Sequence, residues 1–180
     1  MDNTAFDIWV SNRMDFSAED KRECFETAKI IVDLANAVRQ RGLLSLDDKI
    51  ASMDGALLRK ALGLAVDSFG AEEIQKLVQT HIVANNYKGK RLLESLIVKE
   101  GVIAIVNGTN PVTIKLILEA YFGDEFQQEF TDYINAKKDK EPDFKTEFTS
   151  YYKVVSRGDK LTQAQIDNLI KLIQRETDNG

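Results

Sequence analysis

The chain has 180 residues, of which 43% are hydrophobic and 29% are charged, a composition typical of a folded globular domain. A chain of this length buries roughly 70% of the surface that its unfolded form exposes, so it needs neither disulfides nor a structural metal for stability. The net charge of −5 argues against DNA or RNA as a partner, because the densest basic run, residues 137–140, is diluted by neighbouring acids.

Cysteine usage and the apolar pattern together predict a soluble, cytoplasmic protein. The single cysteine, Cys24, cannot form an internal disulfide, which suits a reducing compartment. Residues 1–16 carry several charges and no continuous apolar run, so we expect no signal peptide. The most apolar stretch, residues 101–114, is shorter than the about 20 residues that a membrane-spanning helix needs, so we expect no membrane span.

The first two thirds of the chain carry the periodicity and the start and stop signals of helices. Ser17 opens a Ser-x-x-acid helix start, and apolar residues then recur every three or four positions up to Gly42. Ser45 repeats the start signal, which predicts a tight elbow around Gly42 and a short helix over 45–53. Further helices are predicted over 54–70, 71–84, 91–106 and 111–122, with Asn110 as a cap and Pro111 in the first turn of the last of them.

The pattern changes after Gly123. Aromatic residues over 126–133 predict a short helix, the charged segment 137–143 predicts a loop, and Thr162 opens a capping box for a final helix. We therefore predict an all-α fold: a compact multi-helix bundle of roughly seven to nine helices with short elbows and no sheet. Its domains are expected to be a helical domain over 1–123 and a C-terminal helical extension over 124–180 that packs on it.

The sequence contains no catalytic, metal-binding or cofactor-binding motif. There is no glycine-rich phosphate loop, no His-Glu-x-x-His or Gly-x-Ser-x-Gly, and no cysteine cluster or acidic calcium loop. A lone histidine on a helix, here His81, is more typical of a packed side chain than of a functional one. We therefore expect no metal, no cofactor and no enzyme, although a pocket that gathers several acids around His81 would favour an enzyme.

Two blocks of sequence resemble the flagellar stator protein MotA in the order in which that family has them. The first block includes Arg39-Gln-Arg-Gly-Leu-Leu-Ser-Leu-Asp47 within residues 34–48 and continues through 57–67 and 71–82. The second block is Glu100-Gly-Val-Ile-Ala-Ile-Val-Asn-Gly-Thr-Asn-Pro111 with the helix after it. In the family these blocks are cytoplasmic. The resemblance therefore implies a protein made of the cytoplasmic parts of MotA without its membrane helices, and not an ion channel.

The resemblance also implies a partner and a set of contact residues. The family faces the rotor switch protein of the motor through charged residues, and the matching charges here are Arg39 and Asp47, with Arg41 and Asp48 beside them at the Gly42 elbow. An alternative is that these side chains only complement the partial charges of the helix ends. The expected function is a protein-interaction module that contacts the rotor switch protein, a stator component or another copy of itself. The alternative function is a helical regulatory or scaffold protein that has left the motor.

Overall fold

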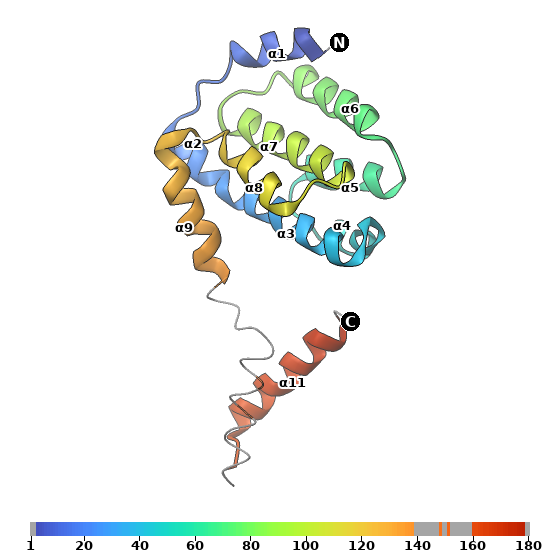
Figure 1. Ribbon diagram of the computed structural model, residues 1–180, viewed down its shortest axis with the longest axis vertical. Helices are drawn as coiled ribbons and strands as arrows, with labels where there is room; N and C mark the ends of the chain where they lie inside the picture. Colours follow the sequence, from blue (N-terminus) through green and yellow to red (C-terminus); the bar gives the residue numbers. More distant parts are fainter. Residues whose placement is uncertain (1–2, 139–147, 149–150, 152–159, 179–180) are drawn as a thin grey trace. The chain divides into compact units, whose positions relative to one another are not determined.

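The computed structural model describes residues 3–138, 148, 151 and 160–178. They fall into two compact units, Met1–Asp132 and Tyr133–Gly180. All regular structure in these residues is helical and no strand occurs among them, which confirms the predicted all-α class (Figure 1).

The helices of the chain follow one another with short connections. In chain order they are α1 (Asn3–Ser11), α2 (Ala18–Glu23), α3 (Phe25–Arg41), η1 (Leu43–Leu46), α4 (Asp47–Ile50), α5 (Ala56–Val66), α6 (Ala71–Ala84), α7 (Gly89–Val106), α8 (Pro111–Glu119), η2 (Asp124–Phe126), α9 (Gln127–Lys138) and α11 (Gln163–Asp178). The η elements are short 3-10 helices.

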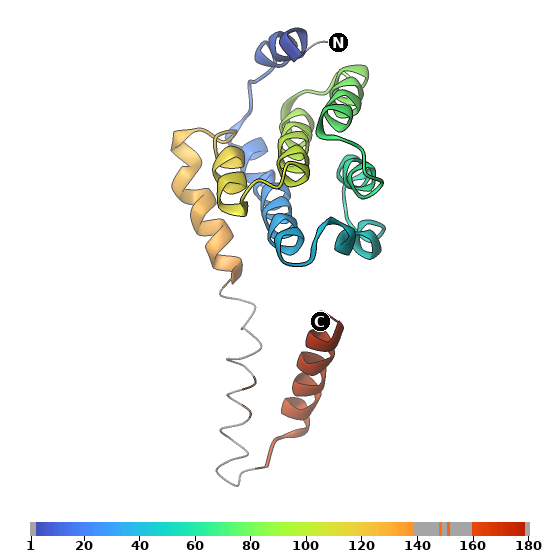
Figure 2. The ribbon, with the colours of Figure 1, turned by 45° about the vertical axis from the view of Figure 1, so that its right-hand side comes forward.

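Helix α7 is the centre of the first unit. It is buried on nearly all sides because its apolar residues cover more than one face, and it packs against α2, α3, α5, α6 and α8. Figure 2 shows α7 between α8 on one side and α5 and α6 on the other. Gly101 lets α3 approach α7 closely, because a Cβ at this position would overlap the side chain of Ile31.

Aromatic side chains pack together at the C-terminal end of the first unit. Phe25 lies with its ring centroid 4.8 Å from that of Phe122 and 5.2 Å from that of Phe130. Two ion pairs, Lys21–Glu125 at 3.2 Å and Arg22–Glu129 at 2.7 Å, lie on the surface beside this cluster. The first unit therefore runs to Asp132, nine residues beyond the end of the domain predicted over 1–123.

Several predicted helix ends match the structure. The Ser17 side chain accepts a hydrogen bond from the Asp20 amide in a capping box, and Asn110 caps α8 with Pro111 in its first turn. Thr162 and Gln165 bond to each other at the start of α11. In the predicted loop over 137–143, residues 137 and 138 are helical and the remainder lies outside the described residues. Helix α1 was not predicted at all.

Candidate protein-interaction site

The predicted elbow around Gly42 is present and is held by local contacts. Gly42 ends α3 with φ +81° and ψ 165°, a conformation that essentially only glycine adopts, and its amide donates to the Val38 carbonyl at 2.8 Å. The Ser45 hydroxyl donates to the Gly42 carbonyl at 2.7 Å, and Leu46 is fully buried below the turn. The chain therefore turns here from α3 into η1 and α4, with one buried leucine at the turn.

The predicted contact residues lie on the two sides of this elbow. Arg39 and Arg41 are exposed in the last turn of α3, and Asp47 is exposed at the first position of α4. Asp48 also lies in α4. Among the residues that the structure describes, neither Arg39 nor Asp47 forms an ion pair. Leu44, between them in the sequence, has 74% of its surface exposed.

A shallow groove adjoins Arg39 and is lined by residues from two distant segments of the chain. It has a volume of about 200 Å³ and is lined by Ala35, Val38, Arg39, Ile105, Gly108 and Thr109. The first three residues belong to the block over 34–48 and the last three to the block over 100–111. The groove exists because α3 packs along α7 and α8, a tertiary contact that helix patterns alone do not predict. We therefore name Arg39, Arg41, Leu44, Asp47 and this groove the Gly42 corner.

A larger cleft lies elsewhere in the first unit, between α3, α6, α7 and the beginning of α5. Its volume is about 590 Å³, which is within the range of small-molecule sites. Its apolar wall includes Ile30, Leu57 and Val98, and three carboxylates, those of Glu26, Asp54 and Glu94, line it together with His81. The sequence does not predict this cleft, because its lining comes from segments that are far apart in the chain.

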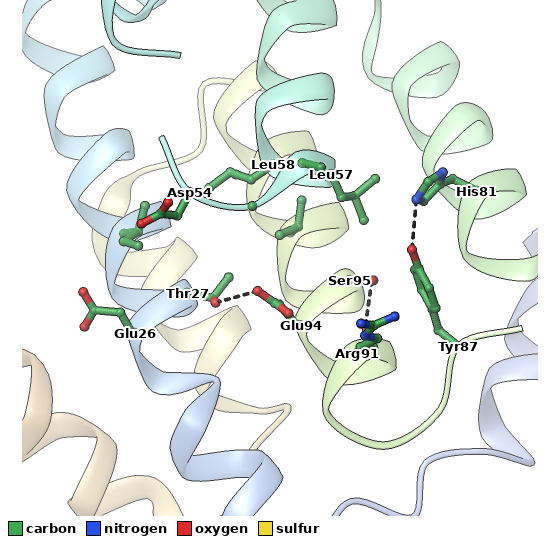
Figure 3. Close-up of a pocket in the computed structure, with 14 residues that line it drawn as sticks. Glu26, Thr27, Asp54, Leu57, Leu58, His81, Tyr87, Arg91, Glu94 and Ser95 are labelled. Atoms are coloured by element: carbon green, nitrogen blue, oxygen red, sulfur yellow. Dashed lines mark hydrogen bonds between the residues drawn. The ribbon is translucent and has the colours of Figure 1, made fainter. Parts of the chain in front are cut away.

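The acids of this cleft do not gather around His81. In Figure 3, His81 and Tyr87 lie at one end of the cleft, whereas Glu26 and Asp54 lie at the other. The Tyr87 hydroxyl is 3.2 Å from His81 Nε2, and Glu94 accepts a hydrogen bond from the Thr27 hydroxyl at 3.4 Å (Figure 3). His81 is thus paired with a phenol and not with a carboxylate, so the cleft contains no His–acid dyad among its lining residues.

In the part of the chain that is described, Cys24 is not a reactive thiol, and the histidine, cysteine and acidic residues form no metal site. Burial, and secondarily the Glu94 carboxylate, raises the pKa of the Cys24 thiol to about 12. A thiol with such a pKa is not a nucleophile at neutral pH. No group of three or more histidine, cysteine, aspartate or glutamate residues within the described ranges is arranged to hold a metal ion.

None of the described helices combines the length and the apolar character that crossing a membrane requires.

No protein-family model matches the chain, and no solved structure matches it. A stretch of 72 residues is 35% identical to the uncharacterized protein YtxD of Bacillus subtilis (strain 168). The matched stretch covers 38% of this chain and 26% of that protein. The chain thus spans about a quarter of the length of this curated relative.

Proposed function

We propose that this chain is a MotA-like protein-interaction module that contacts the flagellar rotor switch protein through the Gly42 corner. The observation that carries this proposal is the groove beside Arg39. Two blocks that resemble one family, more than 50 positions apart in the sequence, supply three residues each to this groove. The second support is the pair of exposed charges, Arg39 and Asp47, on the two sides of a rigid elbow.

The physics of such a surface predicts a weak and salt-sensitive contact. An exposed ion pair contributes only about 0.2–1 kcal/mol, and physiological salt screens charges over roughly 8 Å. Exposed charges therefore set orientation and encounter rate more than affinity. Leu44 and the apolar walls of the groove supply the remaining contact area, since burying them on a partner removes apolar surface from water.

The test is binding of the intact chain to the purified rotor switch protein, by calorimetry at low ionic strength. Arg39→Glu is expected to weaken binding by about two- to thirtyfold at low ionic strength, because it removes an attraction of about 0.2–1 kcal/mol and adds a repulsion of similar size. The matched control is Lys76→Glu on α6, which makes the same change in net charge at an exposed residue away from the corner. Equal affinities for the two variants would contradict the proposed contact surface.

One observation in the second unit favours the alternative function, a helical regulatory or scaffold protein with another partner. Helix α11 exposes Ile166 (36%) and Ile170 (48%) one turn apart. An apolar pair of this kind suits a helix that binds a hydrophobic surface. If Ile170→Glu abolishes binding to a partner while Arg39→Glu leaves it unchanged, the regulatory or scaffold function replaces the motor function.

A further inference from the structure

The cleft beside His81 is a cavity that the proposed interaction surface does not use. Its volume is about 590 Å³, against about 200 Å³ for the groove beside Arg39, and none of the residues that line it lines that groove. A cavity of this size, with apolar walls and a few polar groups from different elements, is typical of a site for a small organic molecule. The polar groups therefore indicate which class of molecule fits.

The hydroxyl groups in the cleft have their protons directed at other protein atoms. Ser95 is buried, with 6% of its surface exposed, and its hydroxyl donates to the Arg91 carbonyl at 2.7 Å (Figure 3). The Thr27 hydroxyl on α3 donates to the Glu94 carboxylate on α7. Because a hydroxyl has a single proton, both oxygens have only lone pairs left for a ligand. This part of the cleft therefore presents hydrogen-bond acceptors, and a ligand here supplies the donors.

Glu94 is a half-buried carboxylate that has no ion-pair partner among the residues that the structure describes. Lys90, one turn before it on α7, pairs instead with Glu23 at 2.6 Å. The Thr27 hydroxyl is 3.4 Å away, which is long for a hydrogen bond between two oxygens. Removing a carboxylate from water without a cation costs free energy, so a positive group bound in the cleft would be attracted to Glu94.

The other charged residues of the lining reinforce this preference. Glu26 and Asp54 lie at the end of the cleft away from His81 (Figure 3). Apart from His81, the charged lining residues are thus three acids and one base, Arg91, whose side chain is exposed. The acids come from α3, from the segment before α5 and from α7. The cleft therefore attracts cations and repels anions.

We infer that the cleft beside His81 is a binding site for a small organic cation, namely a primary amine with an apolar body. An ammonium group has three N–H donors and no acceptor, which matches the acceptors of Glu94, Thr27 and Ser95. The body of the ligand packs on the apolar wall of the cleft, where its burial removes apolar surface from water. This inference does not depend on contact with the rotor switch protein.

The first test is an amide chemical-shift titration of the isotope-labelled full-length chain with phenethylamine. The matched compound is 3-phenylpropionate, which has the same phenylethyl body and a negative charge in place of the positive one. Phenethylamine is expected to shift the amides over residues 26–30, 54–58 and 91–98, whereas 3-phenylpropionate at the same concentration is expected to leave them unchanged. Equal binding of the two compounds, or no binding of phenethylamine to the folded chain, overturns the inference.

The second test assigns the charge preference to Glu94. Glu94→Gln keeps the size of the side chain and removes its charge, so it is expected to weaken phenethylamine binding about tenfold, because hydrogen bonds to charged groups are stronger than those between neutral groups. The control is Glu72→Gln, the same change at an exposed residue of α6 that does not line the cleft. Far-UV circular dichroism verifies that both variants are folded. Equal phenethylamine binding by the two variants overturns the inference.

Discussion

Gly101 of α7 and Ile31 of α3 are in contact without a side chain between them. A Cβ atom on Gly101 would lie 2.9 Å from Ile31 Cδ1 and closer still to Cγ2, and Ile31 is completely buried. The neighbouring side chain therefore has no free space into which it can move. This close approach brings α3 against α7, and the residues that line the groove beside Arg39 come from these two helices and the turn after α7.

We predict that Gly101→Ala lowers the stability of the chain by about 1–3 kcal/mol, since inserting a methyl group into a packed core costs roughly this amount. The control is Gly63→Ala in α5, where no atom lies within 4 Å of the added Cβ. That change should stabilise the chain by about 0.4–1 kcal/mol, because alanine is the better helix former. Urea unfolding measures both. If Gly101→Ala is as stable as the unmodified chain, α3 and α7 are packed less tightly than the structure indicates.

A second prediction concerns Gly42, the glycine of the elbow. Gly42→Ala should lower stability by about 1–3 kcal/mol, because φ +81° with ψ 165° is strained for any residue with a Cβ. Gly70→Ala is the control, since Gly70 has φ −71° and alanine adopts that conformation freely. Thermal unfolding of the two variants is the measurement. If both lose the same stability, the Gly42 conformation is not required for the fold.

The aromatic cluster, and not the surface ion pairs, should hold residues 122–132 in the first unit. Phe130 is fully buried, so Phe130→Ala should cost about 3–5 kcal/mol. Arg22→Ala, which removes the exposed pair with Glu129, should lower stability far less, because solvent screens an exposed ion pair. Chemical unfolding distinguishes the two contributions. A large loss in Arg22→Ala with a small one in Phe130→Ala would reverse this assignment.

The buried thiol predicts a loss of stability in alkali. Burial raises the pKa of Cys24 from its ordinary value of 9.0 to about 12, so the folded chain retains the proton to a higher pH than the unfolded chain does. The stability that the protonated, buried thiol contributes to the fold is complete below pH 9 and is lost progressively between pH 9 and 12. Cys24→Ala should therefore show a flatter fall of stability over this interval, measured by urea unfolding at several pH values.

Reactivity provides an independent measure of the same thiol. In the native chain at pH 8, Cys24 should react with an aromatic disulfide reagent only after unfolding, because it is inaccessible and protonated. Rapid labelling of the folded chain would contradict the burial of this residue.

The features that the sequence predicts well are those decided by neighbouring residues. The capping box at Ser17 and the Asn110–Pro111 helix start depend on side chains and amides within three positions, so the pattern identifies them. Helix α1 escaped prediction because its stability comes from Phe6 and Val10 docking on α7, which is distant in the sequence. Their spacing of four was the one local signal for it.

The candidate site likewise has one part that the sequence predicts and another part that it does not. The charges at the Gly42 corner were predicted, because they lie within nine residues of one another around a glycine stop signal. The groove was not, since Ile105 and Thr109 reach Arg39 only through the packing of α3 on α7. Neither the groove nor the cleft beside His81 has a local sequence signal, because each is lined by segments that are far apart in the chain.

The most direct test of the proposed contact surface is an amide chemical-shift titration of the isotope-labelled chain with the purified rotor switch protein at low salt. We expect the shifted amides to lie over residues 35–47 and 105–109, and the shifts to diminish when the salt concentration is raised. The amides around Lys76 on α6 should stay unchanged. Shifts confined to the cleft beside His81 or to α11, or no shifts with the folded chain, would contradict a contact at the Gly42 corner.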